Sequence, residues 1–590
     1  MKRSLHLIMI ITLAFGFVGA TSLHSPTVQA QDAPSGIWYG TWPYVLPPEH
    51  SLNGFVTNGG VETNLGVMFR SYVEMPMTFY MWSTGEYLPL LADSWGFSDD
   101  NSYYWTKIRE DANWSNDEPV TADDVVATYA IGRIMGWSDF AYIDRVEKVD
   151  EKTVNYYFLE GQQSLLAERF ILKNYIVSAA TYGDLATKAQ ELYDSGATSD
   201  SEEWSALIDE INAFRPEELI ASGPYTYTLD DVGDTYMTLH WQPNSIFSDS
   251  VNFGEIRIWA GETEATTPLV MNGEIAHATN VYPPSTLDAF DAAGIKTVSI
   301  PRGYGPALLF QFDVYPWNVK EVRQATALVI DREENAFLTN GLGATATVYM
   351  SGLSDSMVPT WLSQDVIDQL DHYEFDPDRA GELLRSVGFE LNDDGKWADA
   401  DGNLIKAEFK FPAEFNDFSG MALNATEQMN EFGFDVTARA IPWQQCAEDI
   451  RNGDFELSVW SWSSASPFPA RQFYGPIQRF NYVGLTQEQK GMNFPMEFEW
   501  NGEQIDLDQM INDTSAGLDI EKQKEVTEEV ALIINNLMPY VPLNMLVSVE
   551  PFNTDLIDGA PAPDDPIMQN PSGIDHFVIY TLLTGVLAPK

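Results

Sequence analysis

The chain is short of cysteine and of positive charge. Cys446 is the one cysteine among 590 residues, which excludes a disulfide within the chain and a cysteine-based zinc site. There are 32 lysine and arginine residues against 87 aspartate and glutamate residues, a net charge of −55. Nucleic acids and anionic membranes require a positive footprint, so we expect neither as a partner. The excess of negative charge fits a salty medium, where dissolved ions screen the repulsion between carboxylates.

Motifs of the common catalytic sites are missing as well. There is no G-x-x-x-x-G-K-[ST], no G-x-S-x-G and no H-E-x-x-H. Residues 341–346, GLGATA, have the spacing of a dinucleotide turn, but a predicted helix rather than a strand precedes them. Residues 397–408 imitate a calcium loop, yet Trp397 occupies the first ligand position, which favours a hairpin turn. We therefore expect no catalysis, no cofactor and no metal site, and binding is the default function.

Long apolar runs are absent after the start of the chain. Lys2 and Arg3 precede a run of about 12 apolar residues, followed by a polar stretch that ends at Ala30. This pattern is typical of a secretory signal peptide, because the run falls short of the roughly 20 residues that span a bilayer. We predict that residues 1–30 are cleaved and that the protein is soluble in the periplasm or outside the cell. The mature chain would carry 30 bases against 87 acids, or −57.

The remaining composition predicts a large folded protein. Hydrophobic residues make up 44% of the chain, and its length indicates two or three lobes. Capping residues at 121–124 and 376–388 predict helices, alternation over 143–160 predicts a hairpin, and a long helix is expected over 520–537. Residues 36–95 lack a long helical period and are expected to form strands and loops. Helices and strands mix without a repeat, which is typical of α/β lobes.

Several segments resemble the large extracytoplasmic solute-binding proteins of ABC importers, the oligopeptide/dipeptide-binding family. Residues 113–129, NWSNDEPVTADDVVATY, are similar to the family signature KWSDGTPLTAEDVVFSY. Residues 316–333, PWNVKEVRQATALVIDRE, are similar to PFNDVRVRQALNYAIDRE. Shorter similarities occur at residues 88–95, 222–225, 272–275, 375–388 and 454–462. These segments follow the family order from about residue 88 to residue 543, so the resemblance covers nearly the whole mature chain.

The resemblance implies an α/β, two-lobed periplasmic-binding-protein fold with an extra subdomain in lobe I and a ligand cleft between the lobes. Carried onto this chain, lobe I comprises residues 31–300 and 545–590, the subdomain comprises about 77–214, and lobe II comprises 301–544. Crossovers near residues 300 and 544 would then form the hinge. Closure around a small-molecule solute would let the membrane permease of an ABC importer distinguish loaded from empty protein. The protein is expected to act as a monomer.

Our prediction of the solute class rests on one segment of the sequence. Peptide binders of this family commonly place an aspartate after the W-x-W strand, where it pairs with the amino terminus of the peptide, because a buried unpaired ammonium is costly. Residues 460–468, WSWSSASPF, contain no acid. Some relatives bind β-linked oligosaccharides through aromatic platforms and neutral hydrogen-bonding groups, a chemistry that the 17 tryptophans suit. We therefore rank an oligosaccharide ahead of an oligopeptide.

The candidate ligand contacts are Trp42, Asn53, Trp82, Trp460, Trp462 and Phe468. The first two lie in the N-terminal segment that lines the cleft in the family, and the last three lie at the edge of lobe II. Because side chains alternate along a strand, Trp460 and Trp462 should both meet the cleft or both meet the core. A core position is the alternative for every tryptophan.

Two other classes of protein stay open. A secreted glycoside hydrolase would also be acidic and rich in aromatic residues, and abundant carboxylates do not discriminate, since any pair imitates a catalytic dyad. Such an enzyme would turn over its oligosaccharide, whereas a binding protein binds it saturably without forming product. A structural surface protein would do neither.

Overall fold

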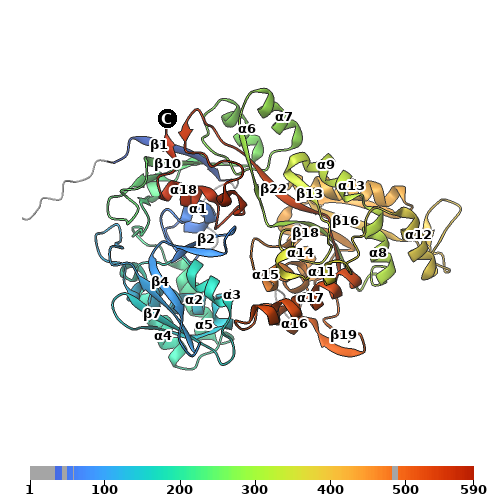
Figure 1. The fold of residues 1–590 in the computed structure, drawn as a ribbon, viewed down its shortest axis with the longest axis horizontal. Coiled ribbons are helices and arrows are strands. Elements are labelled where there is room, and N and C mark those ends of the chain that lie inside the picture. The colour runs from blue at the N-terminus through green and yellow to red at the C-terminus, as the bar shows by residue number, and fades with distance from the viewer. Residues whose placement is uncertain (1–32, 43–49, 57–58, 482–488) are drawn as a thin grey trace, which may run out of the picture.

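The computed structural model describes residues 33–42, 50–56, 59–481 and 489–590, so the predicted signal peptide lies outside the described residues. Figure 1 shows two bodies side by side, joined by strands that cross between them. The first body has a core drawn from residues 38–300 and 552–587. The second has a core drawn from residues 307–546 together with Leu166. We call these bodies lobe I and lobe II.

Lobe I contains two four-stranded sheets, with the strand orders β1-β10-β9-β8 and β4-β5-β7-β6, and the hairpin β2-β3. β1 and β10 run parallel, and the other pairs of the first sheet are antiparallel. The strands are β1 Gly36–Trp42, β2 Thr78–Met81, β3 Glu86–Pro89, β4 Ala92–Phe97, β5 Tyr103–Ile108, β6 Ile143–Lys148, β7 Thr153–Phe158, β8 Tyr225–Thr226, β9 Tyr236–Trp241 and β10 Phe253–Ala260.

The helices of lobe I follow the local signals in most places. The capping pattern at 121–124 opens a helix as predicted, with the backbone N–H of Thr121 donating to the Asp124 carboxylate at 2.7 Å. The predicted hairpin over 143–160 is the antiparallel pair β6-β7. The helices are α1 Val61–Arg70, α2 Ala122–Ile134, α3 Leu165–Lys173, α4 Ala179–Asp194, α5 Glu202–Ala213, α6 Thr263–Met271, α7 Pro284–Ala292 and α18 Phe577–Leu583.

The helix α1 corrects the prediction of strands and loops alone over residues 36–95. Within α1, Gly66 has φ 62° and ψ 168°, so the helical backbone is broken there. The break leaves two short apolar stretches instead of one continuous helical period, so the sequence pattern does not indicate a helix. Glycine is required at this point, because the ring of Trp42 comes within 2.5 Å of where a Cβ would lie.

Lobe II is built on a five-stranded sheet with the order β17-β16-β18-β12-β21. β16 runs parallel to both β17 and β18, whereas β12 is antiparallel to β18 and β21. The strands are β12 Tyr304–Phe310, β16 Lys406–Pro412, β17 Asp435–Ile441, β18 Leu457–Ser463 and β21 Tyr540–Pro542. The main helices are α8 Lys320–Val329, α9 Arg332–Asn340, α12 Pro377–Ser386, α13 Asn416–Glu431, α14 Trp443–Asn452, α15 Pro469–Phe473, η4 Tyr474–Arg479, α16 Leu507–Asp513 and α17 Ile520–Leu537.

A three-stranded sheet joins the two lobes, with the order β11-β22-β13. Its strands are β11 Thr297–Pro301, β13 Ala344–Ala346 and β22 Asn544–Pro551. One end of β22 pairs with β13 and the other end pairs with β11, so a single strand runs from lobe II into lobe I. Figure 1 shows β22 crossing between the bodies.

Candidate ligand-binding site

A pocket of about 390 Å³ lies between the two lobes. Lobe I supplies one wall from the start of α6 and the segment before α7. Lobe II supplies the opposite wall from the ends of its strands and the loops that follow them. The residues of lobe I are Glu262, Thr263, Thr279 and Val281, and the remaining lining residues are Arg302, Tyr304, Glu414, Phe415, Asn416, Asp417, Phe418, Trp443, Trp460, Ser461 and Arg479.

The topology of lobe II explains why so many side chains meet there. β16, β17 and β18 run in the same direction, so their carboxyl ends share one edge of the sheet. The loop after β16 brings residues 414–418 to that edge, α14 begins at Trp443 after β17, and Trp460 and Ser461 lie near the end of β18. Open α/β sheets commonly bind ligands at the carboxyl ends of their parallel strands.

Two aromatic rings of the pocket stack on each other. The rings of Phe415 and Trp443 are 6.0 Å apart with an interplanar angle of 21°. Trp443 is 39% exposed although it is large and apolar. The Trp443 backbone N–H donates to the Glu414 carboxylate at 3.0 Å, which fixes the start of α14. Trp460 lies behind this pair with its ring edge-on to Phe418. The arrangement offers a flat apolar surface to a ligand.

Charged groups of both signs surround the rings. Arg302 and Asp417 form an ion pair of 3.5 Å. Burial raises the pKa of Asp417, an effect that Arg302 opposes. Burial and then the nearby Asp417 charge raise the pKa of Glu262, which reaches the pocket from lobe I. Burial lowers the pKa of Arg479. The pocket therefore offers hydrogen-bond donors and acceptors together, with a carboxylate contributed by each lobe.

Of the candidate contacts in lobe II, Trp460 lines the pocket. Trp462 is fully buried, and its indole N–H donates to the Asn544 carbonyl at 3.1 Å. Both tryptophans are buried in the core of lobe II, as their alternation along one strand allows, and Trp460 also borders the pocket. The backbone of η4 covers the end of β18 beside Trp462, since a Cβ on Gly475 would lie 3.4 Å from the Trp462 Cα. Phe468 is buried in the core of lobe II.

Residues 463–466, which include no acid, form hydrogen bonds with other residues of lobe II. The buried Gln472 side chain accepts from the Ser463 hydroxyl at 3.3 Å and donates to the Ser466 carbonyl at 2.7 Å. The Ser464 hydroxyl donates to the Arg471 carbonyl at 2.9 Å. These contacts hold the turn after β18 and engage the side chains of Ser463 and Ser464.

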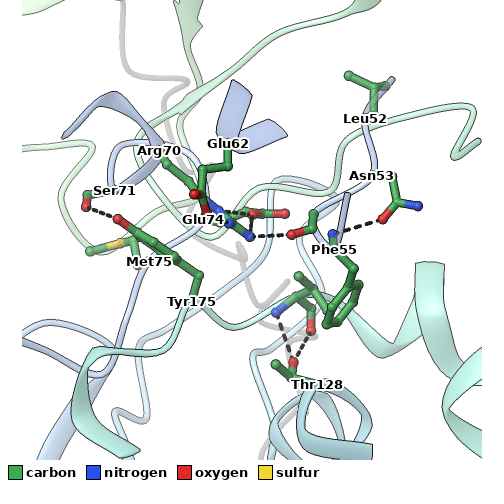
Figure 2. Close-up of polar contacts among 12 residues, drawn as sticks. Leu52, Asn53, Phe55, Glu62, Arg70, Ser71, Glu74, Met75, Thr128 and Tyr175 are labelled. Carbon is green, nitrogen blue, oxygen red and sulfur yellow. Dashed lines mark hydrogen bonds and ion pairs between the residues drawn. The ribbon is translucent and has the colours of Figure 1, made fainter. Parts of the chain in front are cut away.

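The candidate contacts in lobe I lie apart from this pocket. Asn53 is buried, and its amide donates to the Ile211 and Phe214 carbonyls at 2.7 and 3.1 Å and accepts from the Phe55 N–H at 2.9 Å. Figure 2 shows the last of these bonds beside the buried Arg70–Glu74 ion pair. Asn53 thus ties the N-terminal segment to α5.

Trp42 and Trp82 are half-buried. Trp42 packs on Gly66 in lobe I. The Trp82 indole N–H donates to the Asp575 carboxylate at 3.1 Å, and Asp575 also pairs with Arg169 at 2.7 Å. The ring of Trp82 packs against the core of lobe II. The ligand role of all the candidate contacts stays a prediction, and the pocket adds residues that the sequence did not suggest.

Most of the missed residues share one structural signal. They lie directly after β16 and β17, in the connections to α13 and α14 and the first turns of those helices, or on the facing wall of lobe I. The others are Arg302 just before β12, Tyr304 at its start, Ser461 in β18 and Arg479 in η4. From the sequence, AEFNDF at 413–418 is an ordinary polar and aromatic loop. It becomes a candidate only once the parallel pairing of β16 is known, because that pairing places the loop at the carboxyl edge of the sheet.

His277, Glu550 and His576 form a buried group whose ligand atoms are close enough together to hold a metal ion. Both histidine Nε2 atoms contact the Glu550 carboxylate, at 2.6 and 3.0 Å. The Val578 backbone N–H donates to His576 Nδ1 at 3.1 Å, so the proton of a neutral His576 resides on Nε2. A protonated Nε2 cannot bind a metal, and the arrangement fits a hydrogen-bonded triad instead. The calcium-like loop is also a turn, since the Asp399 carboxylate accepts from the Asp401 and Asn403 backbone N–H groups.

Solved structures match this fold over almost its whole length. A periplasmic oligopeptide-binding protein of an oligopeptide ABC transporter from Thermotoga maritima has a TM-score of 0.74 at 19% identity, covering 94% of this chain and 99% of that chain. A structure of the same protein with bound mannohexaose has a TM-score of 0.68 at 19% identity, covering 95% and 100%. The fold is therefore that of the two-lobed periplasmic binding proteins.

Residues 86–480 match the family described as bacterial extracellular solute-binding proteins, family 5 Middle, so the chain belongs to that family. Members of this family are solute-binding proteins that act outside the cytoplasm. The oligopeptide-binding protein AppA of Bacillus subtilis is 22% identical over 474 residues, which is 76% of each chain. A probable ABC transporter-binding protein of Deinococcus radiodurans is 23% identical over 397 residues, or 61% of this chain, and the match spans 62% of that relative's length. Within the described parts of the chain, no helix has the length and apolar character that crossing a bilayer requires.

Proposed function

We propose that this protein is the solute-binding component of an ABC importer and that it captures an oligosaccharide between its lobes for delivery to the permease. The observation that carries the oligosaccharide is the stacked pair Phe415 and Trp443, with Trp443 39% exposed in a pocket lined by both lobes. The relative from Thermotoga maritima whose structure contains mannohexaose supports the same class of ligand.

The chemistry of the pocket suits a sugar. The C–H faces of pyranose rings pack on aromatic rings, and sugar hydroxyls act as both donors and acceptors. Arg302 and Arg479 supply donors, and Glu262 and Asp417 supply acceptors, within the same 390 Å³. A neutral ligand requires no excess charge of one sign, which agrees with this mixture.

An oligopeptide is the second candidate, and the acids of the pocket favour it. Residues 463–466 contain no acid, so the ammonium of a peptide requires another partner. Glu262 and Asp417 reach the pocket from opposite lobes. Burial and then repulsion from Asp417 raise the pKa of Glu262, and a cation between the two carboxylates would relieve the repulsion. The name of the Bacillus subtilis relative, an oligopeptide-binding protein, is consistent with this candidate.

Capture of the solute between the lobes depends on the lobe boundaries that we propose from the sequence. Lobe I is taken as 31–300 and 545–590, with lobe II at 301–544, so that β22 and the short link from β11 to β12 form the hinge. The solute contacts both walls of the pocket only when the lobes are closed, and binding therefore shifts the population toward the closed form. Export after cleavage of residues 1–30 would place a monomeric protein on the outer side of the membrane that holds the permease.

Calorimetry with purified mature protein tests the proposal. The panel contains mannohexaose, cello-oligosaccharides and tri- to pentapeptides, each peptide with a free and with an acetylated amino terminus. We expect saturable binding of one sugar class, little change with ionic strength, and no new product by chromatography after incubation. Binding of free peptides that acetylation abolishes, with no heat from any sugar, would replace the oligosaccharide by a peptide. Release of shorter sugars would show a glycoside hydrolase, and no binding of either class would remove both candidates.

A further inference from the structure

The helix α3 of lobe I contacts lobe II well away from the hinge strands. The backbone of Ser164, directly before α3, forms a parallel bridge with Gly517 of lobe II. Leu166 is 2% exposed and belongs to the core of lobe II, although its neighbours in the chain belong to lobe I. In Figure 1, α3 meets lobe II near α15 and α16, whereas β22 crosses at the other end of the interface. The two lobes are thus joined at both ends of the cleft.

α3 has an apolar face for each lobe. Ile171 and Leu172 are buried in the core of lobe I. Leu166 is buried with the core residues of lobe II, and Phe170, one turn further along, lies beside Arg471 of lobe II. A helix that served lobe I alone would need one apolar face. Lobe II covers Leu166 on this second face, and Phe170 also contacts the ring of Tyr142 of lobe I at 6.0 Å, so separation of the lobes would expose mainly Leu166 to water.

The surface of lobe II that contacts α3 is held by internal hydrogen bonds. The loop between α16 and α17 is held by the buried Gln523 side chain, which donates to the Ala516 and Gly517 carbonyls at 3.1 and 3.0 Å. Thr514 and Ser515 of the same loop are buried. The Arg471 guanidinium of α15 lies 5.9 Å from the centre of the Phe170 ring, which adds a cation–π contact across the interface.

We propose that α3 is a closure latch, and that burial of Leu166 in lobe II sets how much of the protein is in the closed, binding-competent form. The latch consists of Ser164 and Gly517, Leu166 with its surroundings in lobe II, and Phe170 with Arg471. The inference rests on the proposed function, since a latch has meaning only for lobes that open and close. Leu166 is a positioning residue because it does not line the pocket.

The physical consequence follows from linkage. Contacts of α3 with lobe II require no solute, so they favour closure before any solute binds. The apparent dissociation constant equals the intrinsic one divided by the fraction of competent protein. Weakening the latch therefore lowers affinity for every solute by the same factor without touching the pocket, and it opens the solute-free protein.

Small-angle X-ray scattering of solute-free protein provides the first test. The variant Leu166→Ala should fold with a lower melting temperature, because a buried leucine is truncated, and should have a larger radius of gyration than the wild type, because the side chain lies between the lobes. Arg471→Gln should shift the radius in the same direction by less. The matched control Leu159→Ala shortens an exposed leucine of lobe I outside the interface and should change neither quantity, and Leu166→Met should restore the wild-type radius.

Titration of the same variants with mannohexaose provides the second test, where we expect Leu166→Ala to lose about tenfold in affinity and Leu166→Met to keep it. An unchanged radius of gyration in folded Leu166→Ala would overturn the latch. If Leu166→Ala does not fold, an unchanged radius in Arg471→Gln decides against it. A larger radius together with no binding of mannohexaose or any peptide would leave the latch standing and remove the proposed function.

Discussion

Two tryptophans of lobe II illustrate how one residue type serves two purposes. Trp443 is 39% exposed and stacks on Phe415 in the pocket, whereas Trp462 is 0% exposed and hydrogen-bonded to the Asn544 carbonyl. An exposed ring contributes to binding when a ligand covers it, and a buried ring contributes to folding. Substitution by alanine should therefore weaken ligand binding at Trp443 and lower stability at Trp462.

We expect Trp443→Ala to weaken solute binding by about 1–3 kcal/mol and to leave the melting temperature unchanged, as for an aromatic anchor in an interface. Trp462→Ala should lower the free energy of unfolding by about 3–5 kcal/mol, because it leaves a cavity and an unpaired carbonyl. Calorimetry and thermal melting of both variants measure the two effects. A Trp443→Ala protein that binds as tightly as the wild type would remove this ring from the ligand site.

Local sequence signals predicted individual elements of the fold. Asp376 accepts from the Arg379 N–H at 3.0 Å and begins α12, and Gly388 after its end has φ 93°, as the capping residues predicted. α17 spans Ile520–Leu537, also as predicted. These signals succeed because capping and helical periodicity involve residues a few positions apart.

Pairing over long distances in the sequence could not be predicted in the same way. β18 pairs with β12, and β22 pairs with both β11 and β13, through backbone bonds that no local pattern specifies. The candidate site depends on this pairing, because it decides which loops meet at the edge of the sheet. The resemblance to the family's W-x-W strand suggests Trp460, whereas Glu262 and Asp417 come together only through the packing of the two lobes.

The strand β22 is anchored in lobe I by the triad of Glu550 with His277 and His576. The carboxylate accepts from both imidazoles and from the Ser548 hydroxyl at 2.7 Å. Although burial alone would raise it, His576 and His277 hold the pKa of Glu550 well below its usual range. Burial lowers the pKa of His277, an effect that Glu550 opposes. The anchor is therefore strongest when the carboxylate is charged and His277 is neutral.

The stability provided by this anchor should fall in acid. Unfolded His277 takes up a proton near pH 6.5, whereas the folded imidazole resists it, so stability is full above about pH 6.5 and declines below it. At pH 7.5 the wild type should have a larger free energy of unfolding than His277→Asn. This excess should shrink as the pH falls to 5. The loss amounts to about 1.4 kcal/mol for each unit by which the folded and unfolded pKa values of His277 differ. Urea titrations at several pH values measure it, and an excess that is constant or grows in acid would contradict the sign.

At the scale of the whole molecule, the net charge makes stability depend on the ions of the medium more strongly than any single contact does. The chain has 87 acids against 32 bases, so ion pairs can neutralise only a minority of its carboxylates. The interior does not share this imbalance, since buried acids such as Asp575 and Glu74 have cationic partners at 2.7 Å. The unpaired negative charge therefore resides mainly on the surface, where dissolved ions screen it.

Removal of salt should destabilise the protein, because the Debye length grows from about 8 Å at 0.15 M to about 30 Å at 0.01 M and carboxylates then repel one another across each lobe. We expect the melting temperature to rise with sodium chloride over this range, by roughly 1 °C for each kcal/mol of repulsion relieved in a chain of this length. Sucrose of equal osmolality is the control, since it stabilises without screening charge and should not reproduce the response at low concentration. Potassium chloride should match sodium chloride, because screening depends on ionic strength rather than on the cation. A melting temperature that is flat from low to high salt would show that the acidic surface is already neutralised by bound cations or by raised pKa values, and that self-repulsion does not limit stability.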